Sequence, residues 1–119
     1  MEIGKHALIE CAGDISKLGE DELEKLMTHA ATASGATVIS SQFHSFGDGC
    51  GVTGVLVLAE SHITVHTWPE RNYAAFDVFM CGDCDPAIAA QLIAADERTE
   101  RSEVQVIVRG MSPQTQSDA

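Results

Sequence analysis

The residues whose types and spacing suit chemistry lie between Leu58 and Cys84, in the stretch LAESHITVHTWPERNYAAFDVFMCGDC. Ser61 has a hydroxyl that is able to act as a nucleophile, His66 has an imidazole ring that is able to accept a proton, and Cys81 has a thiol. Acyl transfer and proton transfer require a nucleophile, a base and an acid of this kind. This stretch is therefore the candidate active site.

Ser61 also has a simpler interpretation. The strand before it is expected to end at Ala59 and the next to begin at His62, so Ser61 lies at a tight turn, where a serine commonly caps exposed backbone groups. The histidines argue for more than capping. His62 and His66 share one face of a strand because side chains alternate with a period of two residues. Apolar pairing explains the residues between them, but it does not explain two histidines.

Cys81 and Cys84 form a Cys-x-x-Cys pair, which has redox and zinc interpretations. Zinc normally takes four ligands, and the sequence has no second pair of this kind. The two histidines would supply the missing ligands, but Glu60-Ser61 would then have no explanation. We therefore expect no metal. If a disulfide formed between the two cysteines, it would remove the thiol of Cys81.

Hydrophobic periodicity predicts the elements that position these side chains. One helix should run from Glu20 to Ala33 with Gly35 as its C-cap, and another from Pro86 to Ala95 with Asp85 as its N-cap. Strands are expected at Lys5–Cys11, Thr37–Phe43, Val52–Ala59, His62–Trp68, Tyr73–Met80 and Glu103–Val108, with a polar connection at Asp14–Gly19. This order predicts an α+β fold, a two-layer α/β sandwich with a mainly antiparallel sheet and both helices on one face. A single domain would span residues 1–110, and residues 111–119 would form a flexible tail.

The composition narrows the class of partner. The chain has 119 residues, with 18 acidic and 7 basic side chains and a formal net charge of −11. Nucleic acids and anionic membranes both bind clustered cations, so neither is an expected partner. No apolar run approaches the ~18 residues of a membrane-spanning helix. We expect a cytoplasmic protein.

The stretch resembles a known family. The motif Glu-Ser-His-(x)3-His-Thr-Trp-Pro-Glu, followed by Tyr-Ala-Ala-x-Asp and by Cys-Gly, is similar to that of the small prokaryotic S-adenosylmethionine decarboxylases. The upstream sequences Gly4-Lys5-His6, Phe43-His44 and Gly51-Val52-Thr53-Gly54 fit the same pattern. The resemblance extends from about Gly4 to Val108.

The resemblance implies a self-processing proenzyme. Ser61 would attack the carbonyl carbon of Glu60, and the resulting ester would be eliminated and hydrolysed, which splits the chain between the two residues. The products would be a β chain of residues 1–60 and an α chain of residues 61–119 that begins with a pyruvoyl group made from Ser61. By family position, Thr53 supplies a hydroxyl to the processing intermediate and His66 is the base for elimination. The family often has Ser at the position of Thr53, and a Thr hydroxyl makes the same hydrogen bonds.

The resemblance also implies how substrate is bound and turned over. The pyruvoyl group would form a Schiff base with the substrate amine and accept electrons on decarboxylation, as pyridoxal phosphate does. Cys81 has the position of the proton donor, so Cys81→Ala is expected to spare self-cleavage and depress decarboxylation. Glu70 matches the carboxylate that binds the ribose hydroxyls. Trp68 and Phe46 are candidates to line the adenine site.

Two residues of the motif region have no assigned step. His44 follows Phe43 in the family-like dipeptide. Asp77 should face away from Phe76 and Val78, which leaves either a solvated position or a supporting role in the active site.

The predicted function is the pyruvoyl-dependent decarboxylation of S-adenosylmethionine to the aminopropyl donor for spermidine biosynthesis. The resemblance implies a homodimer with two α and two β chains and a site across the protomer interface. Two alternatives remain open. The same chemistry would serve a pyruvoyl-dependent arginine or ornithine decarboxylase, and the fold would also serve an unprocessed, non-catalytic binding or regulatory protein.

Overall fold

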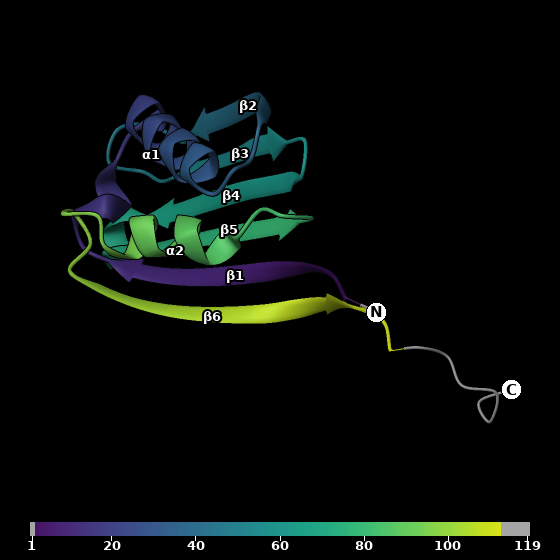
Figure 1. Ribbon diagram of the computed structural model, residues 1–119. Helices are drawn as coiled ribbons and strands as arrows, with labels where there is room; N and C mark the ends of the chain where they lie inside the picture. Colours follow the sequence, from purple (N-terminus) through teal and green to yellow (C-terminus); the bar gives the residue numbers. More distant parts are fainter. Residues whose placement is uncertain (1, 113–119) are drawn as a thin grey trace, which may run out of the picture.

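The computed structural model describes residues 2–112, which form six strands and two helices (Figure 1). The strands are β1 (Glu2–Ala12), β2 (Val38–Ser45), β3 (Val52–Leu58), β4 (Ser61–Trp68), β5 (Tyr73–Cys81) and β6 (Arg101–Gly110). The helices are α1 (Glu20–Ala33) and α2 (Pro86–Ala94), with short 3-10 turns η1 (Asp14–Lys17) and η2 (Pro69–Arg71). Every predicted helix and strand is present, with ends that differ by a few residues.

Local signals set the ends of both helices. The side chain of Glu22 accepts the N–H of Gly19 at the start of α1 (3.3 Å). At its end, Ser34 is the C-cap, and Gly35, the predicted cap, follows it with a φ of 89°, which an L side chain rarely adopts. Asp85 caps α2 by accepting the N–H of Ala87 (3.0 Å). α1 therefore has the predicted bounds, and α2 begins at the predicted residue and ends at Ala94 rather than Ala95.

The strands form one sheet in the order β2-β3-β4-β5-β1-β6, and all neighbours are antiparallel. The buried side chains of β5 alternate with partly exposed ones, and the buried set faces the helices. Both helices cover this same face (Figure 1). The predicted two-layer sandwich is confirmed, and within residues 2–112 no helix covers the other sheet face. We call that surface the open face.

One segment differs from the prediction, and another is only partly described. The predicted polar connection after β1 contains η1, which buries Ile15 and Ser16 against the strands. Only residues 111 and 112 of the predicted tail are described; they follow β6 outside any helix or strand, and the other seven lie outside the described residues.

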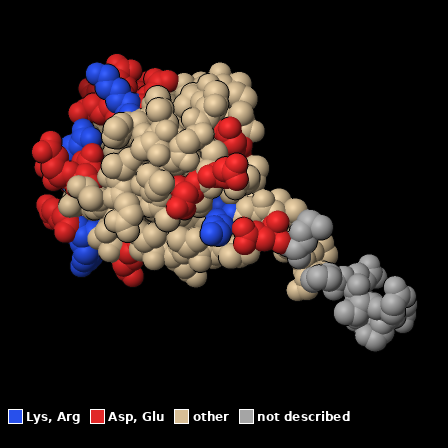
Figure 2. Space-filling view, viewed as in Figure 1, with Lys and Arg blue, Asp and Glu red and all other residues tan. Residues whose placement is uncertain are grey.

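On the helix-bearing side, Lys and Arg side chains are scattered among acidic ones (Figure 2). The view contains no continuous basic surface of the kind that a polyanion would contact. Among the described helices, none is long and apolar enough to cross a membrane.

Candidate active site

A two-residue turn at Ala59 and Glu60 joins β3 to β4, so that Leu58 pairs directly with Ser61. Two-residue hairpin turns normally place positive φ angles on the turn residues themselves. Here the positive φ falls on Ser61, at 143°. In residues 2–112 the only other non-glycine residue with positive φ is Asn72, a residue type that tolerates the left-handed region.

The φ of Ser61 has a direct consequence for its side chain. At this angle the Cβ of an L residue nearly eclipses the carbonyl carbon of the preceding residue about the N–Cα bond. That crowding keeps L residues out of this region, and holding one there costs about 1–3 kcal/mol. The strain therefore brings the hydroxymethyl group of Ser61 towards the carbonyl carbon of Glu60.

The carbonyl oxygen of Glu60 is held from the neighbouring strand. The backbone N–H of Cys81 donates to it (3.2 Å), and so does the Cys81 thiol (Sγ to O, 3.2 Å). Two donors on one carbonyl oxygen polarise the carbon and stabilise negative charge that develops on the oxygen. Glu60, Ser61 and Cys81 therefore form one group at this end of the sheet.

Thr53 and His66 form a second group at the opposite end of β3 and β4. They are direct register partners, and both are exposed on the open face. Trp68 stacks on His66 with ring centroids 4.0 Å apart and planes 5° from parallel. Trp68 also stacks on Tyr73, with ring centroids 5.3 Å apart.

The Tyr73 hydroxyl donates a hydrogen bond to Glu10, and this bond together with burial raises the pKa of Tyr73 to about 12. Tyr73 therefore stays protonated and is not a base for this site.

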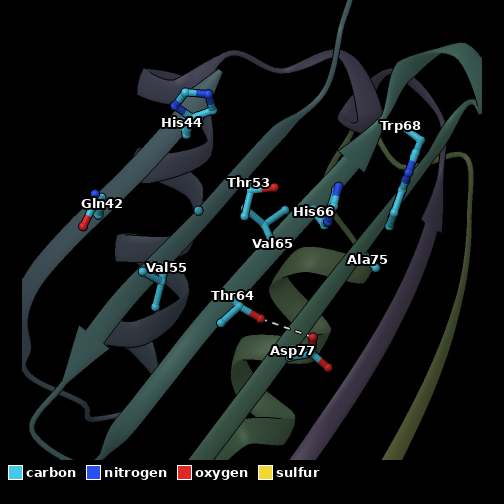
Figure 3. Close-up of a pocket in the computed structure, with 11 residues that line it drawn as sticks. Gln42, His44, Thr53, Val55, Thr64, Val65, His66, Trp68, Ala75 and Asp77 are labelled. Carbon is cyan, nitrogen blue, oxygen red and sulfur yellow. Dashed lines mark hydrogen bonds between the residues drawn. The ribbon is translucent and has the colours of Figure 1, made fainter. Parts of the chain in front are cut away.

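A cavity of about 600 Å³ opens over this second group. Figure 3 shows side chains of β2, β3, β4 and β5 that project from the face away from the helices, whereas Val65, which also lines the cavity, is buried in the core. Its lining includes Thr53, His66 and Trp68 together with others that the sequence left without a role: Gln42, His44, Thr64 and Asp77. Such a volume is typical of a small-molecule site.

Asp77 faces the open side of the sheet, away from Phe76 and Val78, as predicted. It accepts a hydrogen bond from the Thr64 hydroxyl (3.2 Å), and its other oxygen lies 3.4 Å from Nε2 of His6. Its place in the cavity depends on the pairing of β1, β5 and β4. No local sequence signal specifies that pairing, which is why the sequence left the role of Asp77 open.

Glu70 and Phe46 lie at the cavity end of the sheet but outside its lining. Glu70 is exposed in η2, directly after β4. Phe46 is 58% exposed and contacts the ring of His44 edge-on, with centroids 4.6 Å apart. Both are therefore free to contact a molecule larger than the cavity.

The two groups do not meet within one protomer. Ser61 and His66 are five residues apart on the same strand, which corresponds to about 16 Å at ~3.3 Å per residue. The sequence placed both residues in one site, and the structure places them at opposite ends of β4. β4 cannot bend to bring Ser61 and His66 together, because it is hydrogen-bonded to β3 on one edge and to β5 on the other.

The glycines beside Thr53 have a steric reason. A Cβ on Gly51 would lie 2.0 Å from the carbonyl oxygen of Thr67, and a Cβ on Gly54 would lie 2.1 Å from the ring of Phe43. A side chain at Gly51 would push β3 away from β4, and a side chain at Gly54 would displace the ring of Phe43. The glycines thus set the position of Thr53 beside His66.

Within residues 2–112, no three His, Cys, Asp or Glu side chains gather closely enough to hold a metal ion.

Fold and site together define a small α+β domain with a serine at a strained hairpin turn and a cavity on an uncovered sheet face. The model of the S-adenosylmethionine decarboxylase family matches residues 5–110. The chain therefore belongs to the S-adenosylmethionine decarboxylase family, as predicted from its motifs.

Curated relatives agree with this assignment. The chain is 43% identical over 113 residues to the S-adenosylmethionine decarboxylase proenzyme of Bacillus velezensis, covering 93% of this chain and 89% of the relative. It is also 43% identical to the proenzyme of the same name from Methanococcus maripaludis, covering 92% of each. The crystal structure of the adenosylmethionine decarboxylase from Aquifex aeolicus has a TM-score of 0.79 at 35% identity and covers 96% of each chain.

Proposed function

We propose that this chain is a proenzyme that cleaves itself between Glu60 and Ser61 and then decarboxylates S-adenosylmethionine. The observation that supports it most directly is the φ of 143° at Ser61, which turns the hydroxyl towards a carbonyl that Cys81 already polarises. A serine that only capped a turn would not need this conformation. The names of the relatives, which are proenzymes and decarboxylases, favour the same reaction.

The cleavage is an acyl shift followed by an elimination. Oγ of Ser61 bonds to the carbonyl carbon of Glu60, the bond from that carbon to the Ser61 nitrogen breaks, and the hydroxyl proton passes to the nitrogen. A base then removes the α-hydrogen of residue 61, and the Cβ–Oγ bond breaks to release the Glu60 carboxylate. Tautomerisation and hydrolysis of the remaining enamine release ammonia and leave a pyruvoyl group.

The base must come from elsewhere, because His66 of the same chain is about 16 Å away along β4. We propose that a second copy packs its open face against this one. A twofold axis that lies between the sheets and runs across the strands would put the Ser61 end of one copy over the Thr53 and His66 end of the other. The apolar side chains of Val57 and Ile107, which are 40% and 37% exposed on the open face, would be covered by this packing.

The residues around Ser61 fit a pyruvoyl group. Cys81 donates to the carbonyl oxygen beside it, and the cavity end of the second copy would bring Thr53 and His66. Once formed, the group supplies an electron sink for decarboxylation. Cys81 would return a proton to the substrate carbon, Trp68 and Phe46 would contact the adenine, and Glu70 would accept hydrogen bonds from the ribose. The product would be the aminopropyl donor for spermidine synthesis.

Mass spectrometry of the purified full chain tests the proposal. We expect two fragments, residues 1–60 and 61–119, with the second blocked at its N-terminus, and we expect Ser61→Ala to remain intact. A wild-type chain that stays at 12.7 kDa on incubation would exclude self-cleavage.

Carbon dioxide release from S-adenosylmethionine, arginine and ornithine tests the substrate. The stacked rings of His66 and Trp68 at the cavity favour a substrate with a flat nucleoside base. Turnover of arginine or ornithine alone would overturn the assignment of S-adenosylmethionine.

A further inference from the structure

The side chain of Glu60 is anchored far from the bond that would be cleaved. Its Oε1 accepts the backbone N–H of Thr37 at 2.9 Å. The N–H of the preceding residue, Ala59, donates to the carbonyl oxygen of the same Thr37, also at 2.9 Å. One residue of a distant segment thus holds the turn through two hydrogen bonds.

Thr37 is itself fixed by the fold. It lies between Gly35, which ends α1 with its positive φ, and Val38, which begins β2 and pairs with Leu58. The position of Thr37 is therefore set by the docking of α1 and by the β2–β3 register. The anchor of Glu60 is external to the β3–β4 hairpin.

The anchor and Cys81 hold Glu60 from two sides. Rotation of the peptide plane between Glu60 and Ser61 would relax the unfavourable φ of Ser61, because this rotation changes the φ directly. The same rotation would swing the Glu60 carbonyl oxygen away from the Cys81 N–H and thiol. The two bonds to Thr37 hold the Cα of Glu60, which is one end of this peptide unit, in place relative to Cys81, so the anchor helps to preserve the geometry that attack requires.

We propose that the carboxylate of Glu60 is a positioning group for self-cleavage, an inference that rests on the proposed function. Its chemistry is indirect: the carboxylate touches neither the Ser61 hydroxyl nor the carbonyl carbon, and acts by accepting the Thr37 N–H. The scissile residue thus contributes its side chain to the reaction as well as its backbone. Effective attack depends on the orientation of the reacting atoms, and small displacements cause large losses of rate.

Three variants of Glu60 separate position from charge. Glu60→Gln keeps an oxygen acceptor at the same reach, Glu60→Asp keeps the charge but withdraws the acceptor by one methylene, and Glu60→Ala removes it. Intact-mass time courses on the full chain should show Glu60→Gln within about threefold of wild type, and Glu60→Asp and Glu60→Ala slower by about tenfold, the effect of one lost hydrogen bond to a charged group. Glu97→Ala, an exposed glutamate in the α2–β6 connection, is the matched control and should cleave at the wild-type rate.

The step at which Glu60→Ala stalls gives a second readout. If the carboxylate positions the attack, the uncleaved Glu60→Ala chain accumulates as the amide, and hydroxylamine, which cleaves esters, should release no burst of fragments from it. A burst of fragments would mean that the ester had accumulated, so that attack had succeeded, and would overturn the proposal. Wild-type rates for Glu60→Ala, or a fast Glu60→Asp with a slow Glu60→Gln, would also overturn it.

Folding and function are separated by two further measurements. Thermal unfolding of Glu60→Ala in the uncleavable Ser61→Ala background should match that of Ser61→Ala alone, and a large loss of stability would assign the slow cleavage to misfolding and overturn the positioning role. Failure of the wild-type chain to cleave would instead exclude the proposed function itself.

Discussion

The thiol of Cys81 donates a hydrogen bond to the carbonyl oxygen of Glu60, with sulfur and oxygen 3.2 Å apart. The same oxygen also accepts the backbone N–H of Cys81. The family resemblance assigns the thiol to decarboxylation alone. The structure adds a contact to the carbonyl that self-cleavage would attack, so the two reactions are expected to share this side chain.

Cys81→Ala is therefore expected to slow self-cleavage by about tenfold, because it removes one of two donors to the developing oxyanion. It should not abolish cleavage, since the backbone N–H remains. Cys81→Ser, which keeps a donor, should cleave faster than Cys81→Ala. Time courses of the precursor fraction by mass spectrometry measure these rates, and wild-type cleavage by Cys81→Ala would restrict the thiol to decarboxylation.

Protomers with complementary defects should rescue each other if the site spans two copies. Ser61→Ala and His66→Ala homodimers should both fail to cleave. In a mixed dimer, the intact Ser61 of one chain would face the intact His66 of the other, so the His66→Ala chain should be cleaved. Co-expression with distinguishable tags and mass spectrometry of each chain test this. Cleavage that remained absent in mixed dimers would argue for a site within one protomer.

The two fragments should stay together after cleavage. β1, from the first fragment, pairs with β5 and β6 of the second, and β3 of the first pairs with β4 of the second. Separation would expose the edges of several strands and the shared core. We expect the fragments to co-elute in size-exclusion chromatography without denaturant and to separate in urea; separate elution in native buffer would contradict this interleaved arrangement.

Oxidation should inactivate the processed enzyme through Cys81 and Cys84. Residues 82 and 83 form a turn between them, and the Cα atoms at the ends of such a turn lie within ~7 Å, a span that a disulfide bridges. With hydrogen peroxide, two thiols lose two protons and two electrons and the peroxide becomes two waters. We expect a loss of about 2 Da and of decarboxylase activity, both reversed by dithiothreitol.

The rate of that oxidation should rise with pH. Burial raises the pKa of the Cys84 thiol, and the nearby Glu60 carboxylate adds to the shift. The reactive thiolate is therefore scarce at neutral pH and increases as pH rises towards the raised pKa. Cys84→Ser should protect activity at every pH, and inactivation of Cys84→Ser at the wild-type rate would point to another oxidised group.

The helices and strands could be read from the sequence because their signals are local. The acidic first turn of α1, the Asp85 cap and the alternation along β5 depend on neighbouring residues only. The motif around Ser61 likewise identifies the family from the sequence alone, because it is a short run of neighbouring residues. The short η1, with its buried Ile15, was missed because a single turn leaves too little periodicity to detect.

The sequence by itself determined which residues are available for chemistry, the α+β class and the family. The tertiary structure decided which of them meet. Strand pairing brings Cys81 to the Glu60 carbonyl and Thr37 to the Glu60 side chain, contacts between segments more than 20 residues apart. The rigid rise of β4 keeps His66 away from Ser61, although the two are near neighbours in sequence. Proximity in the chain is therefore a poor guide here, because an extended strand separates what a sheet register can bring together.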